Sequence, residues 1–568
     1  MKKIQFIILA LIFTSVLNAQ TLEQGVSLFN EEQYIKAKQL FTSLNKQTPS
    51  AEVCYQLGET YFKLGQIDSA QIAYQQGITL ISKYFYNYAG LGKVQMQKGD
   101  LEAAKVNFDK VRKNSKKDIK LLMTVVDAAI TVSKKDTALA HQYLYFAEAI
   151  DPKSPYLHLF YGDFNLAIRN SGQAINDYNN ALYYGADKET AYIRLGGLYA
   201  RVRNFKDSEL SFKKAIESNP NSTIAYKKMG DMYYSFGKYA DAKTAYATYS
   251  AKVTTSEDEK EKFALILFFN KNYDETESLI NEIAAQNKDN SVLYRIRAYT
   301  AYERADYQKG LEYMNQFFSI QKADKVIPLD YEYNAKLLVQ TGKDSLAINS
   351  YLKAFEMDTT KYQDIEEVVK IYAKNKKHEN AIKYYSLLNK YPQQDKSNLA
   401  YSIGKEYYFD GGETKSRLDS VEKRLNQKKL PLPNDFSVQR ANMLDKFVKA
   451  DSCFSIVNTL SPRFGSAYLF KGRTQAIIDP ESKTDKAKNA YESYLAIAQT
   501  SKTPDNVNII ESYAYLASYY YFQSLRAPQN SELQKTNKQL SINYFEKIIA
   551  LDPTDKQAND ALLLLKKK

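Results

Sequence analysis

The chain has 568 residues, of which 44% are hydrophobic and 25% charged, and its formal net charge is +13. These are globular values, so they exclude wholesale disorder. The length exceeds that over which one hydrophobic core grows, so the sequence encodes either several domains or a repeat array.

The N-terminus is typical of a secretory signal peptide. Lys2 and Lys3 precede an apolar run at 4–17, and the small residue Ala19 follows. The run is shorter than the roughly 20 residues that span a bilayer, so an uncleaved anchor is the weaker alternative. We therefore predict a signal peptide at 1–19, export to the periplasm or the outside of the cell, and no transmembrane segment after cleavage. With no cysteine near the cleavage point, the mature chain is not expected to be a lipoprotein.

Positive charge is moderate and dispersed. Removal of Lys2 and Lys3 lowers the net charge from +13 to +11. Basic residues cluster at 113–120, 370–377 and 423–429, but acidic residues are interspersed through the array. This pattern favours solvated helix faces, with an anionic partner as the alternative. Because the chain is predicted to be exported, no nucleic acid partner is expected.

The two cysteines, Cys54 and Cys453, lie far apart in the sequence. In a linear array each unit touches only its neighbours, so a disulfide between them is excluded by geometry. Both are predicted to be buried small apolar residues. They therefore give no information about the redox compartment.

A small residue recurs through the chain at a nearly constant spacing. This spacing is the number of residues that separates Gly162 from Gly196. A second small position follows twelve residues later, and a large apolar residue such as Tyr74 or Phe212 comes four residues after that. An interior glycine costs a helix about 1 kcal/mol, so its repeated use needs a packing reason, which we infer to be close approach of a partner helix. Each unit is thus predicted to be two antiparallel helices. The small positions of the first helices are Gly25, Gly58, Gly92, Ala128, Gly162, Gly196, Gly230, Ala264, Ala298, Ala335, Val369 and Gly404.

This pattern resembles the tetratricopeptide repeat (TPR), a helix-turn-helix of about 34 residues with Leu-Gly, a tyrosine, a small residue, an aromatic residue and a closing proline. The resemblance implies an all-α fold, a right-handed superhelical solenoid of about fifteen repeats, here of an exported bacterial type. One departure is that tryptophan never fills the position four residues before the small residue, which Cys54, His158 and Tyr192 occupy instead. No linker-like segment interrupts the array, so one continuous solenoid is expected.

The rhythm is delayed by one full period beyond Gly404. We interpret the delay as one degenerate repeat, with a second helix at 413–425, a joint at 430–434 and a first helix at 435–448. The predicted organisation divides the mature chain into four parts. They are an N-terminal TPR array at 20–410, a degenerate repeat or hinge at 411–434, C-terminal repeats at 435–556, and a capping helix with a basic tail at 557–568.

Catalytic and metal-binding motifs are not found. The only histidines are His141, His158 and His378, and they form neither an HExxH pair nor a Cys/His ligand cluster. The Gly-Lys pair at 342–343 lacks the preceding glycine of a phosphate-binding loop, so it is interpreted as a turn. We therefore expect no enzyme activity, no cofactor and no metal.

The family resemblance implies that the first helices line a concave groove that binds a partner protein or peptide. In the family, groove residues lie three before, one after and four after the small position. The binding residues predicted in this way are Tyr55, Glu59, Phe62, Lys93, Asp163, Lys227, Asp231, Tyr234, Phe268, Arg295, Tyr299 and Tyr302. The lining mixes tyrosine with charge, and tyrosine offers a large contact area at low entropic cost.

The predicted role is a non-enzymatic protein-protein interaction scaffold of the bacterial cell envelope. The alternative is a glycan-binding protein that uses groove tyrosines, because tyrosine rings stack on sugars. The clamp with which some family members hold chaperone tails needs lysine before and asparagine after the small residue. Lys227 is followed by Asp231 at that place, so this clamp is not expected.

Overall fold

The structure is a computed structural model that describes residues 21–500, 503 and 505–566. The signal peptide predicted at 1–19 lies outside these residues. The chain divides into two compact units, Met1–Leu293 and Tyr294–Lys568. The sequence predicted no boundary at that point.

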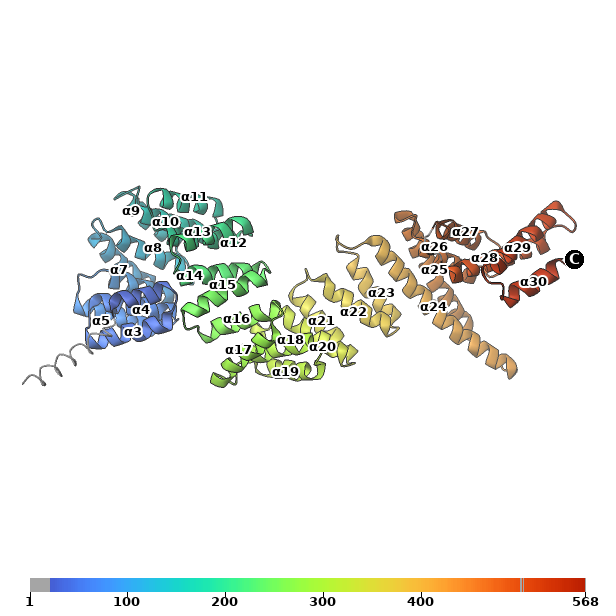
Figure 1. Ribbon diagram of the computed structural model, residues 1–568, viewed down its shortest axis with the longest axis horizontal. Coiled ribbons are helices and arrows are strands. Elements are labelled where there is room, and N and C mark those ends of the chain that lie inside the picture. The colour runs from blue at the N-terminus through green and yellow to red at the C-terminus, as the bar shows by residue number, and fades with distance from the viewer. Residues whose placement is uncertain (1–20, 501–502, 504, 567–568) are drawn as a thin grey trace, which may run out of the picture. The chain divides into compact units, whose positions relative to one another are not determined.

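Every regular element of the described residues is helical, and no strand is found among them (Figure 1). The all-α repeat fold predicted from the sequence is confirmed. The helices of the first unit are α2 (Leu22–Asn30), α3 (Tyr34–Gln47), α4 (Ala51–Lys63), α5 (Ile67–Leu80), α6 (Tyr86–Lys98), α7 (Leu101–Asn114), α8 (Ile119–Thr131), α9 (Thr137–Glu148), α10 (Pro155–Ala167), α11 (Ser171–Tyr183), α12 (Lys188–Arg201), α13 (Phe205–Ser218), α14 (Thr223–Ser235), α15 (Tyr239–Lys252), α16 (Glu257–Phe269) and α17 (Tyr273–Gln286).

The second unit begins within α18 and continues to α30. Its helices are α18 (Ser291–Glu303), α19 (Tyr307–Ile320), α20 (Pro328–Gln340), α21 (Asp344–Met357), α22 (Tyr362–Lys374), α23 (His378–Leu388), α24 (Lys396–Gln427), α25 (Phe436–Leu460), α26 (Gly465–Ile478), α27 (Lys486–Ala498), α28 (Asn506–Arg526), α29 (Glu532–Leu551) and α30 (Lys556–Lys566), with the short 3-10 helix η1 (Ala323–Lys325) before α20. From α2 to α29 the helices form fourteen hairpins, where the spacing predicted about fifteen repeats.

The glycines at the small positions are required by an aromatic ring that each one faces. A β-carbon at Gly58 would lie 2.4 Å from the ring of Tyr74, and one at Gly162 would lie 2.2 Å from the ring of Tyr178. Both rings come from the second helix of the same hairpin, sixteen residues later, and both are buried. The close helix approach predicted from the spacing is therefore confirmed, and it sets the distance between the two helices.

Most first helices are followed by a residue in the left-handed conformation, seven residues after the small position. Gly65 has φ 72° and Arg203 has φ 61° at this place. The N–H group of the next residue, as in Gln66, bonds back to the carbonyl of Tyr61, which closes the helix end. The same turn thus recurs through the array even where the residue is not glycine.

The region at 411–434 differs from the predicted arrangement. The sequence predicted a separate helix from 413, but α24 is a single helix of 32 residues that runs through this point. Gly411 lies within this helix and does not break it. A β-carbon there would lie 3.0 Å from the ring of Phe447 in α25, so the glycine allows close packing as in the other hairpins. The delay of one period is therefore absorbed by one elongated hairpin of α24 and α25, with its turn at the predicted joint.

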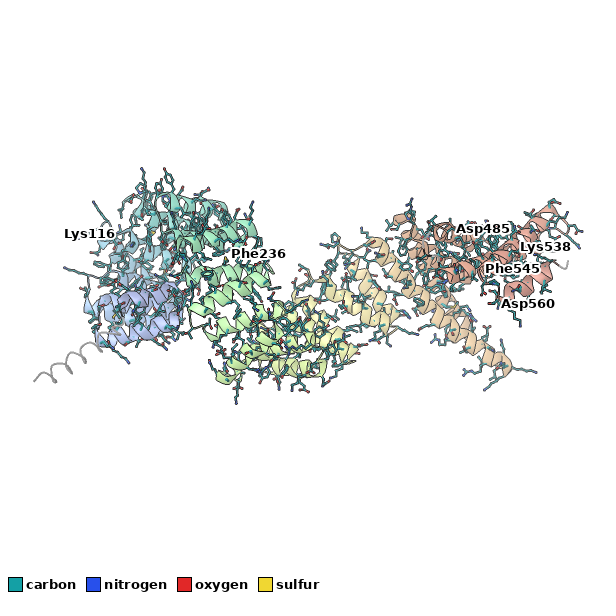
Figure 2. All side chains as sticks on the ribbon, in the orientation of Figure 1. Lys116, Phe236, Asp485, Lys538, Phe545 and Asp560 are labelled. Atoms are coloured by element: carbon teal, nitrogen blue, oxygen red, sulfur yellow. The ribbon has the colours of Figure 1, made fainter. Side chains whose placement is uncertain are left out.

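The last helix, α30, packs on the hairpin of α28 and α29. Ala558 and Ile548 belong to one buried apolar cluster, and Phe545 of α29 packs against it. Phe545 and Asp560, which mark α29 and α30, are labelled in Figure 2. Leu563 and Leu564 on the other side of α30 are exposed. The helix thus covers apolar surface of the final hairpin.

Candidate binding surface

The first helices of successive hairpins in the first unit carry a line of paired charges. Lys93 of α6 lies between two carboxylates, with its Nζ 3.0 Å from Glu59 of α4 and 2.7 Å from Asp127 of α8. The side chain of Lys93 is only 2% exposed. Burial alone would lower the pKa of Lys93, but Asp127 and Glu59 outweigh it and raise that pKa, so the lysine remains charged.

Tyrosine hydroxyls from the second helices donate to carboxylates of the first helices. The Tyr74 hydroxyl lies 2.7 Å from Glu59, and the Tyr178 hydroxyl lies 2.7 Å from Asp163. The two residues of each pair are fifteen apart, because the tyrosine is the ring that faces the small position and the carboxylate follows that position directly. The rings that hold each hairpin together thus also orient the charges on its first helix.

A second cation position repeats farther along the unit. Arg194 of α12 lies 3.1 Å from Asp163, and Lys262 of α16 lies 2.8 Å from Asp231. Each cation belongs to the repeat after that of its carboxylate and stands two residues before the small position there. The charges of the first helices are therefore mostly satisfied between neighbouring repeats.

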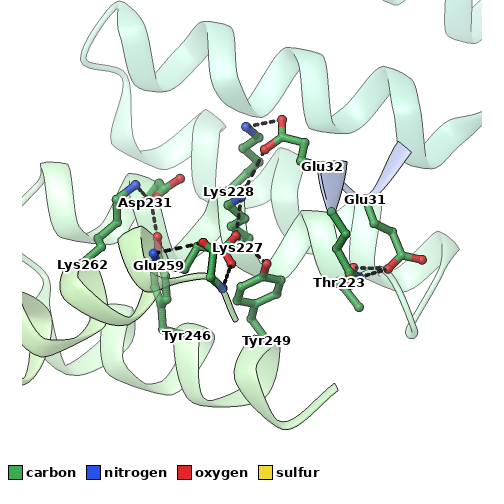
Figure 3. A network of polar contacts seen from close by, with 12 residues as sticks. Glu31, Glu32, Thr223, Lys227, Lys228, Asp231, Tyr246, Tyr249, Glu259 and Lys262 are labelled. Carbon is green, nitrogen blue, oxygen red and sulfur yellow. Dashed lines mark hydrogen bonds and ion pairs between the residues drawn. The ribbon is translucent and has the colours of Figure 1, made fainter. Parts of the chain in front are cut away.

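The first unit also contains a contact between residues that are 195 apart in the sequence, which we call the clasp (Figure 3). Glu32, in the turn between α2 and α3, lies 2.7 Å from Lys228 and 3.3 Å from Lys227 of α14. Next to it, the hydroxyl of Thr223 donates to Glu31 at 3.1 Å. The repeats of this unit therefore coil far enough for the first hairpin to meet the seventh.

The clasp is electrostatically stable at neutral pH. Burial opposes ionisation of Glu32, but Lys228 and Lys227 outweigh it and keep the pKa of Glu32 below its usual value. Lys227 also pairs with Glu259 of α16 at 2.8 Å, and Glu259 accepts the hydroxyl of Tyr249 at 2.7 Å. One lysine thus joins the clasp to the charges of the first helices.

The second unit contains a buried pair of similar design. Asp330 of α20 is fully buried and accepts two hydrogen bonds from Arg295 of α18, at 2.7 and 2.8 Å. The hydroxyl of Tyr299 donates to the same carboxylate at 2.7 Å. The guanidinium of Arg295 also lies 4.7 Å from the ring centre of Phe317, so the cation has both a bidentate carboxylate and an aromatic face.

A cleft of about 450 Å³ lies in the second unit, where the first helices α18, α20 and α22 follow one another. Its wall combines tyrosine, carboxylates and lysines, including Tyr302, Glu332, Lys336, Asp364, Glu367 and Lys370. Lys370 pairs with Glu367 at 2.6 Å, and Glu332 pairs with Lys361. The volume is within the range of ligand pockets, about 300–1,000 Å³. We call this the α20 cleft.

Comparison with known proteins supports the family suggested by the repeat. The sequence matches the tetratricopeptide repeat family model at residues 51–84 and 189–222. These are the hairpins of α4 with α5 and of α12 with α13. The chain contains tetratricopeptide repeats.

Relatives of this TPR protein share only part of its length. It is 25% identical over 226 residues to a TPR repeat-containing protein of Methanocaldococcus jannaschii, covering 40% of this chain and 32% of that protein. It is 26% identical over 243 residues to Superkiller complex protein 3 of Mus musculus, covering 41% and 15%. The chain thus spans less than a third of the length of each of these two relatives. Among solved structures, the C-terminal part of a TPR repeat-containing protein from Cytophaga hutchinsonii is 26% identical, covering 53% of this chain and 99% of that chain with a TM-score of 0.38.

Most of the predicted binding residues are engaged within the TPR protein. Those held by ion pairs or hydrogen bonds to other described residues are Glu59, Lys93, Asp163, Lys227, Asp231, Arg295 and Tyr299. Lys93, Phe268 and Tyr299 are at most 3% exposed. Hairpin packing and inter-repeat pairing therefore bury these three positions, and ligand contact by them stays a prediction.

The remaining predicted residues are half-buried aromatics. Tyr55 contacts the rings of Tyr84 and Tyr86, and Phe62 lies under the ammonium of Lys93, 4.6 Å from its ring centre. Two more belong to the same class, Tyr234 in the first unit and Tyr302 in the α20 cleft. The structure brings Tyr302 to a cleft, packs Tyr55 and Tyr234 against neighbouring rings and places Phe62 under the ammonium of Lys93. Ligand contact by these residues stays a prediction.

Sequence reasoning missed the carboxylates that lie five residues before the small position. These are Glu259, Asp330 and Asp364, which lie in the first turns of the first helices α16, α20 and α22. Their recurrence at one position of the repeat is a signal that alignment of the repeats could have found.

The contacts of His378 and the arrangement of the histidine, cysteine and acidic side chains bear on whether the described residues hold a metal site. His378 is buried, with its Nδ1 2.6 Å from Glu406 of α24, so it joins two neighbouring hairpins. Within residues 21–500, 503 and 505–566, no group of histidine, cysteine and acidic side chains is arranged to hold a metal ion.

Among these same described residues, none of the helices combines the length and the apolar character needed to cross a membrane.

Proposed function

We propose that this TPR protein is a non-enzymatic scaffold exported to the bacterial envelope, where the faces formed by its first helices hold a segment of a partner protein. TPR proteins generally mediate protein-protein interaction, and the sequence begins with residues typical of a secretory signal. The observation that carries the proposal is the α20 cleft. It places tyrosine and both signs of charge in one recess.

The envelope location is tested by the mature N-terminus. Cleavage after Ala19 would leave Gln20 as the first residue, and mass spectrometry of the protein from a native cell fraction identifies it. A chain that retains 1–19 and stays in the cytoplasmic fraction contradicts export. This measurement is independent of partner binding.

Partner binding is tested by photo-crosslinking in cells. A benzophenone amino acid replaces Tyr302, which lines the α20 cleft, and in a control it replaces Tyr183 of α11, which is 83% exposed. A discrete protein crosslinked from position 302 but not from position 183 supports the proposal. If neither position captures a protein and purified chain is retained on a glycan array, the glycan alternative holds instead.

A further inference from the structure

Three repeats place a carboxylate at the same position, five residues before the small residue of the first helix. In two of them a cation from the preceding repeat reaches it. Glu259 pairs with Lys227, and Asp330 pairs with Arg295. Both cations lie three residues before their own small position. A tyrosine hydroxyl also donates a hydrogen bond to each of these two carboxylates. The carboxylate position of the repeat is thus suited to hold a cation.

The third carboxylate, Asp364, has a different neighbour. In the repeat before that of Asp364, the position equivalent to Arg295 is occupied by Glu332, which carries the same charge as Asp364. The position equivalent to Tyr299 is occupied by Lys336. Asp364 is 5% exposed, and its Oδ2 is buried without a hydrogen-bond partner among the described residues. Burying a carboxylate oxygen without a donor is costly, so this atom is an unsatisfied acceptor in the wall of the α20 cleft.

A second carboxylate in the same cleft also offers a buried oxygen. Asp344 accepts the side-chain amide of Asn375 at 2.7 Å through Oδ2, while its Oδ1 is buried without a partner among the described residues. The Tyr302 and Tyr351 rings belong to the same wall. Two acceptors beside aromatic rings suit a planar cation, which can donate to carboxylates and stack on a ring at once.

We propose that the α20 cleft binds an arginine side chain of a partner polypeptide, whose guanidinium pairs with Asp364 as Arg295 pairs with Asp330 one repeat earlier. This inference rests on the proposed function and names the chemistry that the partner presents. Of the two precedents within this chain, the nearer one, a single repeat earlier, is a bidentate arginine-carboxylate pair. Guanidinium is also the less strongly hydrated cation, so arginine is favoured over the lysine that Glu259 holds.

The charges around Asp364 make this binding depend on pH. Glu332 and Lys336 face it from α20, Lys361 from the start of its own helix, and Asp358 from the preceding turn. Burial and Glu332 raise the pKa of Asp364 to about 7, against the opposing effect of the two lysines. A guanidinium prefers the carboxylate form, so affinity is expected to fall about tenfold per pH unit below pH 7 and to level off above it.

The probe is the peptide acetyl-Gly-Arg-Gly-amide, titrated calorimetrically into the full chain at pH 8. The control peptide carries citrulline, a neutral isostere of arginine. The arginine peptide is expected to bind at least tenfold more tightly, and this advantage should disappear by about pH 5. Equal affinities for the two peptides overturn the proposal. Tighter binding of spermidine than of the arginine peptide also overturns it, in favour of a free polyamine.

Two variants locate the site. Asp364→Asn removes the charge at constant shape and is expected to weaken the arginine peptide about 30-fold or more. Glu332→Arg places a guanidinium at the position that Arg295 occupies one repeat earlier. This variant is expected to abolish peptide binding while circular dichroism shows that the chain stays folded.

The control variant is Glu356→Gln, at an exposed residue of α21. It makes the same charge change as Asp364→Asn and should leave affinity unchanged. Unchanged affinity in Glu332→Arg contradicts the proposal even if Asp364→Asn fails to fold.

This inference and the proposed function can fail separately. If a protein crosslinks at Tyr302 equally well in the wild type and in Asp364→Asn, the scaffold role stands and the arginine site is wrong. If the arginine peptide binds through Asp364 but no protein crosslinks at Tyr302, the site stands as a guanidinium site and the scaffold role is wrong.

Discussion

Lys93 and Glu59 occupy the same position of two consecutive repeats, one full period apart, and their side chains form an ion pair at 3.0 Å. Asp127, one period farther on, takes the other side of the ammonium at 2.7 Å. The repeat period therefore not only stacks the hairpins but also alternates charge along their first helices. Three repeats are tied together through a single buried lysine.

Replacing Lys93 with methionine should destabilise the first unit markedly. The change keeps most of the unbranched apolar part of the side chain but leaves Glu59 and Asp127 facing each other without a cation. Removing one partner of a buried pair costs about 3–5 kcal/mol, and the partial exposure of Asp127 places the expected loss near 3 kcal/mol. Urea unfolding measures it.

The matched control for this change is Lys98→Met. Lys98 pairs with Asp68 at 2.7 Å, but the two side chains are 41% and 90% exposed. An exposed pair of this kind contributes about 1 kcal/mol or less. If the two variants lose the same stability, burial of Lys93 does not matter and the charge line is only a surface feature.

The adjacent glycines Gly196 and Gly197 should respond in opposite directions to alanine. A β-carbon at Gly196 would lie 2.9 Å from the ring of Phe212, whereas one at Gly197 meets nothing within 4 Å. Gly196→Ala is therefore expected to destabilise the hairpin by about 1–3 kcal/mol through overpacking. Gly197→Ala should stabilise it by about 0.5–1 kcal/mol, because alanine is the better helix former.

Urea or thermal unfolding of the two single variants and the wild type makes this comparison. Equal effects would show that the ring of Phe212 moves aside at no cost. The small position would then not fix the distance between the helices.

The same glycines show how much of the fold can be predicted from the sequence. The constant repeat spacing identifies Gly196 as a packing position, and the structure places the ring of Phe212 against it. The fold follows from such local periodicity. The separate helix predicted at 413–425 is wrong, because Gly411 packs on Phe447 inside one continuous helix.

The candidate sites depend on relationships that local spacing does not encode. Arg295 meets Asp330 across an insertion of three residues, which lengthens the interval between the small positions Ala298 and Ala335, so the pair is visible only after the repeats are aligned. The contact of Glu32 with Lys228 depends on how far successive hairpins rotate, a quantity set by the packing of many side chains. No segment near either residue predicts it.

The clasp should be detectable by zero-length crosslinking of the full chain. A carbodiimide joins a carboxylate to an amine only where the two are in contact, and Glu32 lies 2.7 Å from Lys228. Mass spectrometry is therefore expected to find a peptide pair linked between α14 and the turn after α2. The link should be lost in Glu32→Gln. The pair of Lys98 with Asp68, also at 2.7 Å, is the internal standard. A link at this standard without one at Glu32 would mean that the first unit does not close on itself in solution.

The raised pKa of Asp364 should appear as a pH-dependent penalty on stability. Its pKa is about 7 in the folded protein against an ordinary value of 3.8, so the folded chain binds this proton more tightly than the unfolded chain. Stability from this group is therefore highest below pH 4, falls as the pH rises to about 7, and is constant above that. The fall is at most about 4 kcal/mol, from about 1.36 kcal/mol per pH unit. Asp364→Asn cannot ionise, so its stability relative to the wild type should rise over the same interval.

Asp552→Asn is the control with the opposite sign. Hydrogen bonds from Thr554 lower the pKa of Asp552, so its carboxylate stabilises the folded chain above pH 4, and this contribution is lost as the pH falls. The asparagine variant should therefore lose stability relative to the wild type as the pH rises through this lower range, with no change near pH 7. Urea unfolding of the wild type and both variants from pH 2.5 to 8.5 separates the two groups. A flat difference for Asp364→Asn across pH 4–7 would show that this carboxyl ionises normally, which requires a cationic partner for it within the chain itself.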